Sequence, residues 1–435
     1  MPVNFRLPSV LLFVTLILLS VFLPAAPAVT GTSPINAADT AWMLTATALV
    51  LFMTPGLSFF YGGMVGRKNV ISTMLQSFVC MGIVSLLWVI VGFSLCFGDS
   101  IGGVIGDPRT FFMFRHVTGA THAALSPTIP LILFALFQMK FAIITPALIT
   151  GSFAERVRFS SYTLFVSLFS IFIYAPLAHM TWHPDGLLRK MGVLDFAGGT
   201  VVHMSAGIAA LVGAIYLGRR QSHLSREPHR PANIPYVILG TGMLWFGWFG
   251  FNAGSALAAN ELASLAFATT NTASASAMLT WILLDCLRGQ KPSAMDACIG
   301  AVVGLVAVTP AAGFVTVAHS LAIGAIASCV SHFAVHLKSR SQLDDTLDVF
   351  PCHGVGGIVG MILTGVFVQE KGLLSGETHT FYVHLLALVG VSAFCLVLSY
   401  VLYVITNAIA PIRVDKDHEL IGLDLSQHAE TILST

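Results

Sequence analysis

The chain has 435 residues, of which 56% are hydrophobic and 9% charged, and its formal net charge is +1. Soluble domains carry about 25% charged residues, so this composition excludes a soluble globular protein and indicates an integral membrane protein in a lipid bilayer. A net charge so close to zero, without a basic stripe that could bind phosphates, excludes nucleic acid as a partner. The seven cysteines form no C-x-x-C pair, so we expect no metal site and no disulfide framework. No cofactor is expected either.

The first 28 residues have the layout of a secretory signal. Arg6 precedes an apolar run from Val10 to Leu23, and the small residues 25–28 (Ala-Ala-Pro-Ala) follow this run. We therefore expect residues 1–28 to be a signal peptide that is cleaved near Ala28. An uncleaved first helix is the alternative, which we disfavour because the apolar run is short.

Eleven further apolar runs are long enough to cross a bilayer, which takes about 20 residues. They cover residues 40–63, 71–97, 126–153, 158–180, 196–217, 234–254, 261–287, 294–311, 313–336, 350–369 and 384–408. The connections between them are short, so we expect one membrane domain over residues 29–410 and a cytoplasmic tail over residues 411–435. The predicted fold class is an all-α polytopic membrane protein.

Lysine and arginine are distributed unequally between the predicted loops. With the mature N-terminus outside, 14 of the 21 lie on the cytoplasmic side and five outside, Arg6 and Lys140 being the other two. The positive-inside rule therefore predicts an external N-terminus and a cytoplasmic C-terminus. Two groups of five spans plus a last helix then form inverted repeats, which place a substrate path at their interface.

Each half contains one histidine shortly after an aspartate, in the runs Asp195-FAGGTVV-His203 and Asp348-VFPC-His353. Ionisable side chains at membrane depth are costly unless they are paired or line a polar path. A lone histidine in an apolar helix is usually a hydrogen-bonded core residue. Two histidines in equivalent places of the two halves instead favour a pair that lines a narrow pore and hydrogen-bonds a small polar molecule. Metal ligation is the alternative, but no third ligand has suitable spacing.

Three aspartates near these histidines have both an electrostatic and a structural interpretation. Asp195 precedes His203 by eight residues, at the external start of the fifth span. We expect it mainly to cap that helix, while its charge also attracts cations to the pore mouth. Asp345 and Asp348, at the start of the tenth span, are expected to be caps.

Aromatic residues cluster near the predicted external ends of the spans. Phe137 and Phe141 share a helix face, Phe251 lies in the sixth span, and Trp182 ends the fourth span. Such residues usually pack or anchor a helix at the membrane interface. Rings around an external vestibule would instead hold a small cation by cation–π attraction, with Ser255 accepting a hydrogen bond. The residues by themselves leave both interpretations open.

Seven colinear motifs make the chain resemble the Amt/Mep ammonium transporter family. They are MTPGLSFFYGGMV (53–65), FQMKFAIITPALITGSFAERVRF (137–159), AHMTW (178–182), DFAGGTVVH (195–203), GWFGFNAGS (247–255), GLVAVTPAAGFV (304–315) and DVFPCHGVGGIVG (348–360). The resemblance covers essentially the whole mature chain. It implies eleven helices per protomer, a homotrimer with one pore in each protomer, and a multi-pass protein of the cell membrane. The signal sequence favours a bacterial inner membrane.

The resemblance also implies a role for each matching residue. Phe141, Trp182 and Ser255 would form the ammonium recruitment site, Phe141 and Phe251 the stacked gate, and His203 and His353 the twin histidines of the pore, while Asp195 matches the aspartate that is essential in the family. Ammonium would lose a proton near the gate and ammonia would pass the histidines, with the proton moving separately. The tail is similar to a regulatory segment to which a PII-type signalling protein binds in many members.

One departure and three alternatives accompany this interpretation. Lys140 lies beside Phe141, where a small or apolar residue is expected. Because about 100° of helix rotation separates the two residues, Lys140 is expected to extend to the membrane interface.

An ammonium sensor acting through a cytoplasmic partner is the main alternative function. A membrane enzyme would need a nucleophile or metal constellation, which is not found. An Rh-like gas channel is disfavoured by Trp182 and Ser255.

Overall fold

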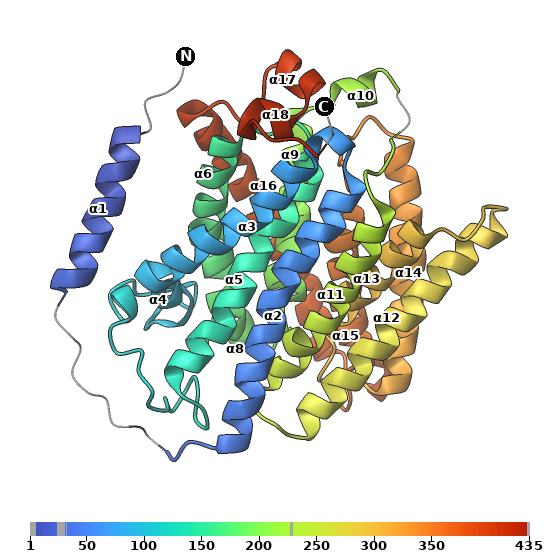
Figure 1. The fold of residues 1–435 in the computed structure, drawn as a ribbon. Helices are drawn as coiled ribbons and strands as arrows, with labels where there is room; N and C mark the ends of the chain where they lie inside the picture. The colour runs from blue at the N-terminus through green and yellow to red at the C-terminus, as the bar shows by residue number, and fades with distance from the viewer. Residues whose placement is uncertain (1–5, 24–30, 32, 227–228, 433–435) are drawn as a thin grey trace.

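The computed structural model describes residues 6–23, 31, 33–226 and 229–432 of the chain. They form one bundle of long helices that run side by side between two ends of the molecule (Figure 1). All eleven predicted runs are helical. Their segments are α2 (Ala37–Met64), α3 (Val70–Leu87) with α4 (Phe93–Phe97), α5 (Leu131–Phe153), α6 (Phe159–Phe169) with α7 (Ala175–Trp182), α9 (Ser205–Leu217), α11 (Ile234–Ala253), α12 (Glu261–Leu287), α13 (Ala294–Val308), α14 (Val317–Ser339), α15 (Gly356–Phe367) and α16 (His379–Ile409).

Within the described residues, nine helices are long and apolar enough to cross a membrane. The predicted spans that fall outside this set are α12, whose 27 residues are rich in alanine, serine and threonine, and α13, which has 15 residues. The outer faces are apolar; α16, for example, exposes Leu386, Val389 and Val397. The protein is therefore a multi-pass membrane protein, and eleven crossings remain a prediction.

Four helical segments contain a π-helical turn, in which the backbone hydrogen bonds skip one extra residue. These turns are η2 (Trp88–Gly92), η4 (Ser170–Tyr174), η5 (Gly199–Met204) and η7 (Phe350–Val355). The last two begin the fifth and tenth segments and pack against each other. This pairing of the fifth with the tenth segment is the one that inverted repeats require at their interface.

The first and sixth segments, α2 and α11, also pack along each other. Glycines allow the close approach: a Cβ atom at Gly63 would lie 2.6 Å from the Asn233 carbonyl oxygen, and one at Gly56 would lie 2.9 Å from Met243 Cβ. Small residues at such crossings let membrane helices make extensive van der Waals contact. The two halves are therefore joined along two pairs of corresponding segments.

The tail helices α17 (Lys416–Ile421) and α18 (Leu423–His428) and the short helix α10 (Gln221–Leu224) lie at one end of the bundle, while α2 begins at the opposite end (Figure 1). Basic loop residues hold the tail at its end: Lys68 Nζ donates to the Leu420 carbonyl, and Arg158 pairs with Asp415 at 2.9 Å. The two ends of the predicted mature chain are thus on opposite sides of the bundle. Which side faces the cytoplasm stays a prediction.

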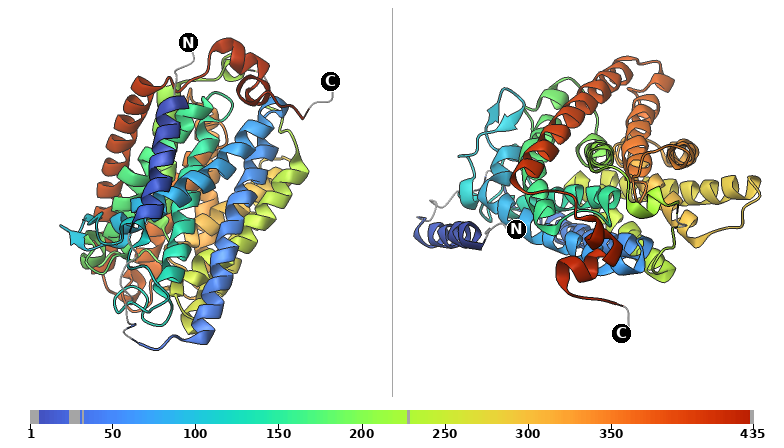
Figure 2. Two further views of the ribbon diagram at one scale, coloured as in Figure 1. Left: turned by 60° about the vertical axis from the view of Figure 1, so that its left-hand side comes forward. Right: turned by 90° about the horizontal axis from the view of Figure 1, so that it is seen from above.

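Helix α1 (Arg6–Phe22) lies at the edge of the bundle (Figure 2). The expected cleavage near Ala28 falls outside the described residues, so the signal peptide stays a prediction. The remaining short elements are the hairpin β1 (Ser100–Ile101) with β2 (Ile105–Gly106), the helix α8 (Leu187–Lys190) and the 3-10 turns η1 (Arg67–Asn69), η3 (Phe112–Phe114), η6 (Gly254–Ala256) and η8 (Leu373–Ser375).

Candidate functional site

The two histidines lie side by side where the fifth and tenth helical segments meet. His203 belongs to η5 and His353 to η7, and their Nδ1 atoms are 3.3 Å apart. Both side chains are buried, so the neutral forms are favoured. A neutral pair with this contact holds one proton between the Nδ1 atoms, which leaves one ring with an accepting Nε2 and the other with a donating Nε2–H.

Glycines at the crossing of the two segments make this contact possible. A Cβ atom at Gly207 would clash with the backbone of Gly354, and one at Gly357 would lie 3.0 Å from the Gly199 carbonyl oxygen and 3.3 Å from His203 Cβ. Any larger residue would push the two turns apart. The sequence pattern His-x-x-x-Gly and His-Gly-x-x-Gly therefore has a packing reason.

A narrow cavity adjoins the histidines. Its volume is about 10 Å³, which holds roughly one water-sized molecule. His203 and His353 are its two ionisable lining residues, and the others are Met53, Leu57, Phe60, Ile144, Leu148, Val202, Leu244, Trp248, Phe251 and Val302. The Trp248 ring stacks on His203 at 5.3 Å and its Nε1 donates to Thr309. A small neutral molecule suits such a cavity, whereas a bare ion would lose its hydration without compensation.

Two stacked phenylalanine rings close one side of this cavity. Phe141 and Phe251 stack with their centroids 4.1 Å apart and an interplanar angle of 29°, and both are buried. Phe137 packs edge-on against Phe141 at 5.0 Å. By contrast, Phe249 stacks on Phe267 on another face of α11. The stacked pair separates the histidine cavity from a wider space.

That wider space is a vestibule of about 420 Å³, lined by Phe141, Trp182 and Ser255 among others. The Trp182 ring meets Phe141 edge-on at 5.8 Å. Ser255 Oγ donates to the Phe251 carbonyl, which leaves the hydroxyl oxygen free to accept. The structure thus brings together the three residues that the sequence suggested for a recruitment site, with two π faces and one acceptor around one space.

Asp195 connects the vestibule with the histidines. Its carboxylate accepts hydrogen bonds from the Gly198, Gly199 and Thr200 amides and from the Thr200 hydroxyl. Its carbonyl oxygen accepts from Trp182 Nε1 at 3.1 Å. The carboxylate therefore caps the turn that carries His203, while the adjacent carbonyl orients the indole. Gly198 has φ +116°, a conformation that favours glycine.

In the other half, Asp345 occupies the corresponding place: it lies eight residues before His353, as Asp195 lies eight before His203. Its carboxylate accepts from the Phe350 amide at 2.7 Å. Burial raises the pKa of Asp345 to about 6, and the nearby Asp348 charge adds to the rise although Lys338 opposes it. Asp348, which the sequence suggested as the partner aspartate, forms an ion pair with Lys338 at 2.7 Å.

Sequence reasoning missed three polar residues that line the vestibule: Gln138, Thr181 and Arg189. Gln138 Oε1 and Thr181 Oγ1 are buried and make no hydrogen bond within the protein. The sequence did contain a signal for two of them, because Gln138 lies three residues before Phe141 and Thr181 lies directly before Trp182.

Lys140 is half-buried and is not among the vestibule residues, so its ammonium group lies off the entry path. Among the residues that the structure describes, no cluster of three His, Cys, Asp or Glu could hold a metal ion.

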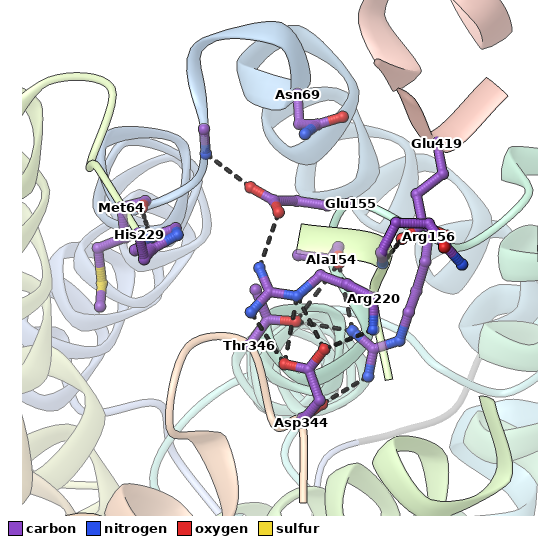
Figure 3. Close-up of polar contacts among 12 residues, drawn as sticks. Met64, Asn69, Ala154, Glu155, Arg156, Arg220, His229, Asp344, Thr346 and Glu419 are labelled. Carbon is purple, nitrogen blue, oxygen red and sulfur yellow. Dashed lines mark hydrogen bonds and ion pairs between the residues drawn. The ribbon is translucent and has the colours of Figure 1, made fainter. Parts of the chain in front are cut away.

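A buried charge network lies at the tail end of the bundle (Figure 3). Arg220 pairs with Glu155 at 2.7 Å and with Asp344 at 2.9 Å, and Arg156 donates to the Asp344 carbonyl and to Thr346. Burial, the largest single influence, would raise the pKa of Glu155, but the Arg220 charge and the hydrogen bond from the Gly66 amide together outweigh it and hold that pKa below its ordinary value. For Asp344, burial is likewise outweighed by the hydrogen bonds from Arg220 together with the Arg156 and Arg220 charges, which lower the pKa.

The tail joins this network through Glu419. Its carboxylate accepts from the Gln221 amide and pairs with Arg413 at 2.9 Å. Farther along the tail, Asp424 accepts from the Ser72 amide and Asn69 accepts from the Leu423 amide. The tail therefore contacts a loop of the first half, at Asn69 and Ser72, and the connection between the two halves, at Gln221.

These features define a polytopic helical membrane protein with a vestibule, a stacked aromatic constriction and a narrow cavity lined by two histidines. A sequence model described as the Ammonium Transporter Family matches residues 41–432. The chain therefore belongs to the ammonium transporter family.

Relatives of similar length support this assignment. The chain is 44% identical over 407 residues to the putative ammonium transporter of Methanothermobacter thermautotrophicus, which covers 91% of this chain and 98% of that protein. It is 44% identical over 421 residues to the ammonium transporter of Aquifex aeolicus, covering 95% and 97%.

Two solved structures share the fold. The crystal structure of Saccharomyces cerevisiae Mep2 matches with a TM-score of 0.83 and 33% identity, covering 88% of each chain. A structure described as a sensor Amt protein matches with a TM-score of 0.83 and 29% identity, covering 90% of this chain and 98% of that one.

Proposed function

We propose that this protein recruits ammonium in the external vestibule, removes one proton and conducts ammonia through the histidine-lined cavity into the cytoplasm. One observation carries this proposal: two neutral histidines, 3.3 Å apart, line a cavity of about 10 Å³ behind a stacked phenylalanine pair. The cavity accepts one small molecule that can both donate and accept hydrogen bonds. Ammonia has this chemistry, and a bare ammonium ion does not.

The first step is recruitment. Phe141 and Trp182 offer π faces to a cation, and the Ser255 oxygen accepts one of the four ammonium N–H groups. The Phe141 and Phe251 rings exclude water from the passage beyond. Because the charged form would be desolvated there, ammonium loses a proton before ammonia passes the rings. The proton reaches the cytoplasm separately, by way of the histidine pair, so one positive charge moves for each ammonia.

The wider assignment follows from the family. We propose eleven crossings in two inverted repeats plus a final helix, with an external N-terminus and a cytoplasmic C-terminus. Residues 1–28 form the signal peptide, 29–410 the membrane domain and 411–435 the regulatory tail. The protomers form a homotrimer with one pore each in a bacterial inner membrane. The tail, which contacts loops of the first half and the connection between the halves, is the place for a PII-type partner. The relatives are transporters, so no enzymatic activity is assigned.

The test is an ammonium-induced current on a solid-supported membrane, with purified protein in liposomes. Wild-type protein is expected to give a current, and His203→Leu to reduce it at least about tenfold, because Leu cannot carry a proton or hydrogen-bond ammonia. Protein-free liposomes and Phe249→Leu, on another face of α11, are the controls. An internal pH rise without current would contradict separate proton movement.

A second candidate, an ammonium sensor, is favoured by the resemblance to the solved sensor Amt protein. It predicts neither current nor pH change in liposomes that contain this chain alone. Silence in both assays, with folded protein in the membrane, would therefore favour the sensor over the transporter.

A further inference from the structure

Arg189 places a positive charge in the vestibule through which ammonium is proposed to enter. It belongs to the short helix α8, and its side chain lines the vestibule. Arg189 Nη1 donates to the Trp182 carbonyl oxygen at 2.7 Å. This hydrogen bond holds the guanidinium at the wall beside the proposed recruitment site, although the side chain is exposed. The charge therefore has a fixed place on the entry path.

Among the described residues, no acidic side chain forms an ion pair with Arg189. The only acidic residue among the described vestibule residues is Asp195, whose charged carboxylate accepts its hydrogen bonds from three amides and one hydroxyl and none from Arg189. Lys190, the next residue, pairs with Asp185 at 2.7 Å. It lines an adjoining cavity of about 880 Å³ and not the vestibule itself. The guanidinium, which has no ion-pair partner in the described part of the chain, therefore adds a positive contribution to the potential of the vestibule.

We propose that Arg189 sets the cation affinity and charge selectivity of the vestibule. Its charge opposes every cation that approaches Trp182, and the opposition doubles for a divalent cation because Coulomb energy scales with charge. Ammonium regains part of this energy from the π faces and the Ser255 oxygen, whereas a strongly hydrated divalent cation does not. Arg189 thus lowers ammonium affinity and keeps divalent cations out of the site. This inference rests on the proposed transport of ammonium.

The experiment compares Arg189→Gln with the wild type in ammonium-induced current measurements on proteoliposomes. At low ionic strength the half-saturating ammonium concentration is expected to fall about two- to fourfold, the size of one screened charge at an exposed site. The difference shrinks at about 0.3 M salt, where screening is stronger. Mg²⁺ is expected to inhibit Arg189→Gln at lower concentration than the wild type.

Two variants separate charge from positioning. Arg189→Lys keeps the charge and is expected to resemble the wild type in affinity and salt dependence. Lys190→Gln removes the same charge from the neighbouring position, beside Asp185 and outside the vestibule lining, and is expected to lower the half-saturating concentration by less than Arg189→Gln does. If Arg189 served only to position Trp182 through its hydrogen bond to the Trp182 carbonyl, Arg189→Gln would raise the half-saturating ammonium concentration at every salt concentration.

The outcomes also separate this inference from the proposed function. A wild type without any current or pH change overturns ammonium transport itself. A normal wild-type current with an unchanged, raised or salt-independent half-saturating concentration in Arg189→Gln overturns only the role of Arg189. A fall that Lys190→Gln reproduces equally would assign the effect to general surface charge and would overturn it as well.

Discussion

The walls of the vestibule contain two oxygen atoms that make no hydrogen bond within the protein, Gln138 Oε1 and Thr181 Oγ1. Leaving a buried polar atom unpaired costs about 1–3 kcal/mol. Ammonium has four N–H donors and no acceptor, so it is complementary to oxygen atoms of this kind. At the scale of single residues, we therefore expect Gln138 and Thr181 to supply hydrogen-bond acceptors to a bound ammonium ion.

Thr181→Val tests this contribution. Valine has nearly the shape of threonine but lacks the oxygen, so we expect the half-saturating ammonium concentration to rise about two- to tenfold, as for the loss of one hydrogen bond. The current assay measures it, and the melting temperature should not fall. Thr163→Val, whose hydroxyl donates to the Ser160 carbonyl on an exposed face of α6, is the control. Equal affinities in both variants would contradict a role for Thr181.

Lys140→Met addresses the residue that departs most from the family pattern. Because Lys140 is not among the vestibule residues, removing its charge is expected to change the half-saturating ammonium concentration by less than about twofold at any ionic strength. The same current assay measures it. A clear increase in affinity would place the ammonium group of Lys140 at the entry path instead.

The aspartates show where residue-level prediction from the sequence fails. Asp195 is the single acidic residue near His203, so the sequence identifies it directly. Asp345 and Asp348 both precede His353, and the one that accepts the turn amide is Asp345, because only it lies a full eight residues before the histidine. Gln138 and Thr181 were missed because their importance depends on which helix face meets the vestibule.

At the scale of elements, the two π-helical turns η5 and η7 bring the histidines together. Their flanking α-helices could be predicted, since apolar runs of sufficient length specify membrane helices almost by themselves. The turns could not, because the extra residue in each is tolerated only through contacts between the two halves. Gly207 against Gly354 is the closest of these contacts.

Gly207→Ala is expected to destabilise the protein by about 1–3 kcal/mol, the usual cost of overpacking, because its Cβ atom would clash with the Gly354 backbone. The melting temperature in detergent measures the loss, and the ammonium current should fall as the histidines separate. Gly242→Ala adds the same atom on α11 where nothing lies within 4 Å. A melting temperature equal in both variants would show that the crossing can relax.

At the scale of the whole molecule, the Arg220 network joins the loops of both halves to each other. Glu155 and Asp344 have pKa values below their ordinary ones, so their ionised forms stabilise the folded state. This contribution is complete above about pH 4, the unfolded pKa of a carboxyl group, and is lost as the pH falls below it.

Arg220→Met would leave two buried carboxylates unpaired, and we expect a loss of about 3–5 kcal/mol at pH 7. The loss should shrink as the pH falls towards 4, because the carboxyl groups of the variant become protonated and neutral. Melting temperatures from pH 7 to pH 4 measure both trends. Lys190→Met, which breaks an exposed pair with Asp185, should leave the melting temperature nearly unchanged. A loss that is independent of pH would contradict this account.

Helices α12 and α13 have a consequence for how the chain enters the membrane. Alone, α12 is too polar and α13 too short to count as a membrane-spanning helix, yet each packs extensively against the other and against α14. A translocon that releases helices into lipid one at a time would not retain either in the bilayer. If α12 and α13 cross the membrane as proposed, we expect the three helices to leave the translocon as a group, so that biogenesis of the second half waits until α14 has been synthesised.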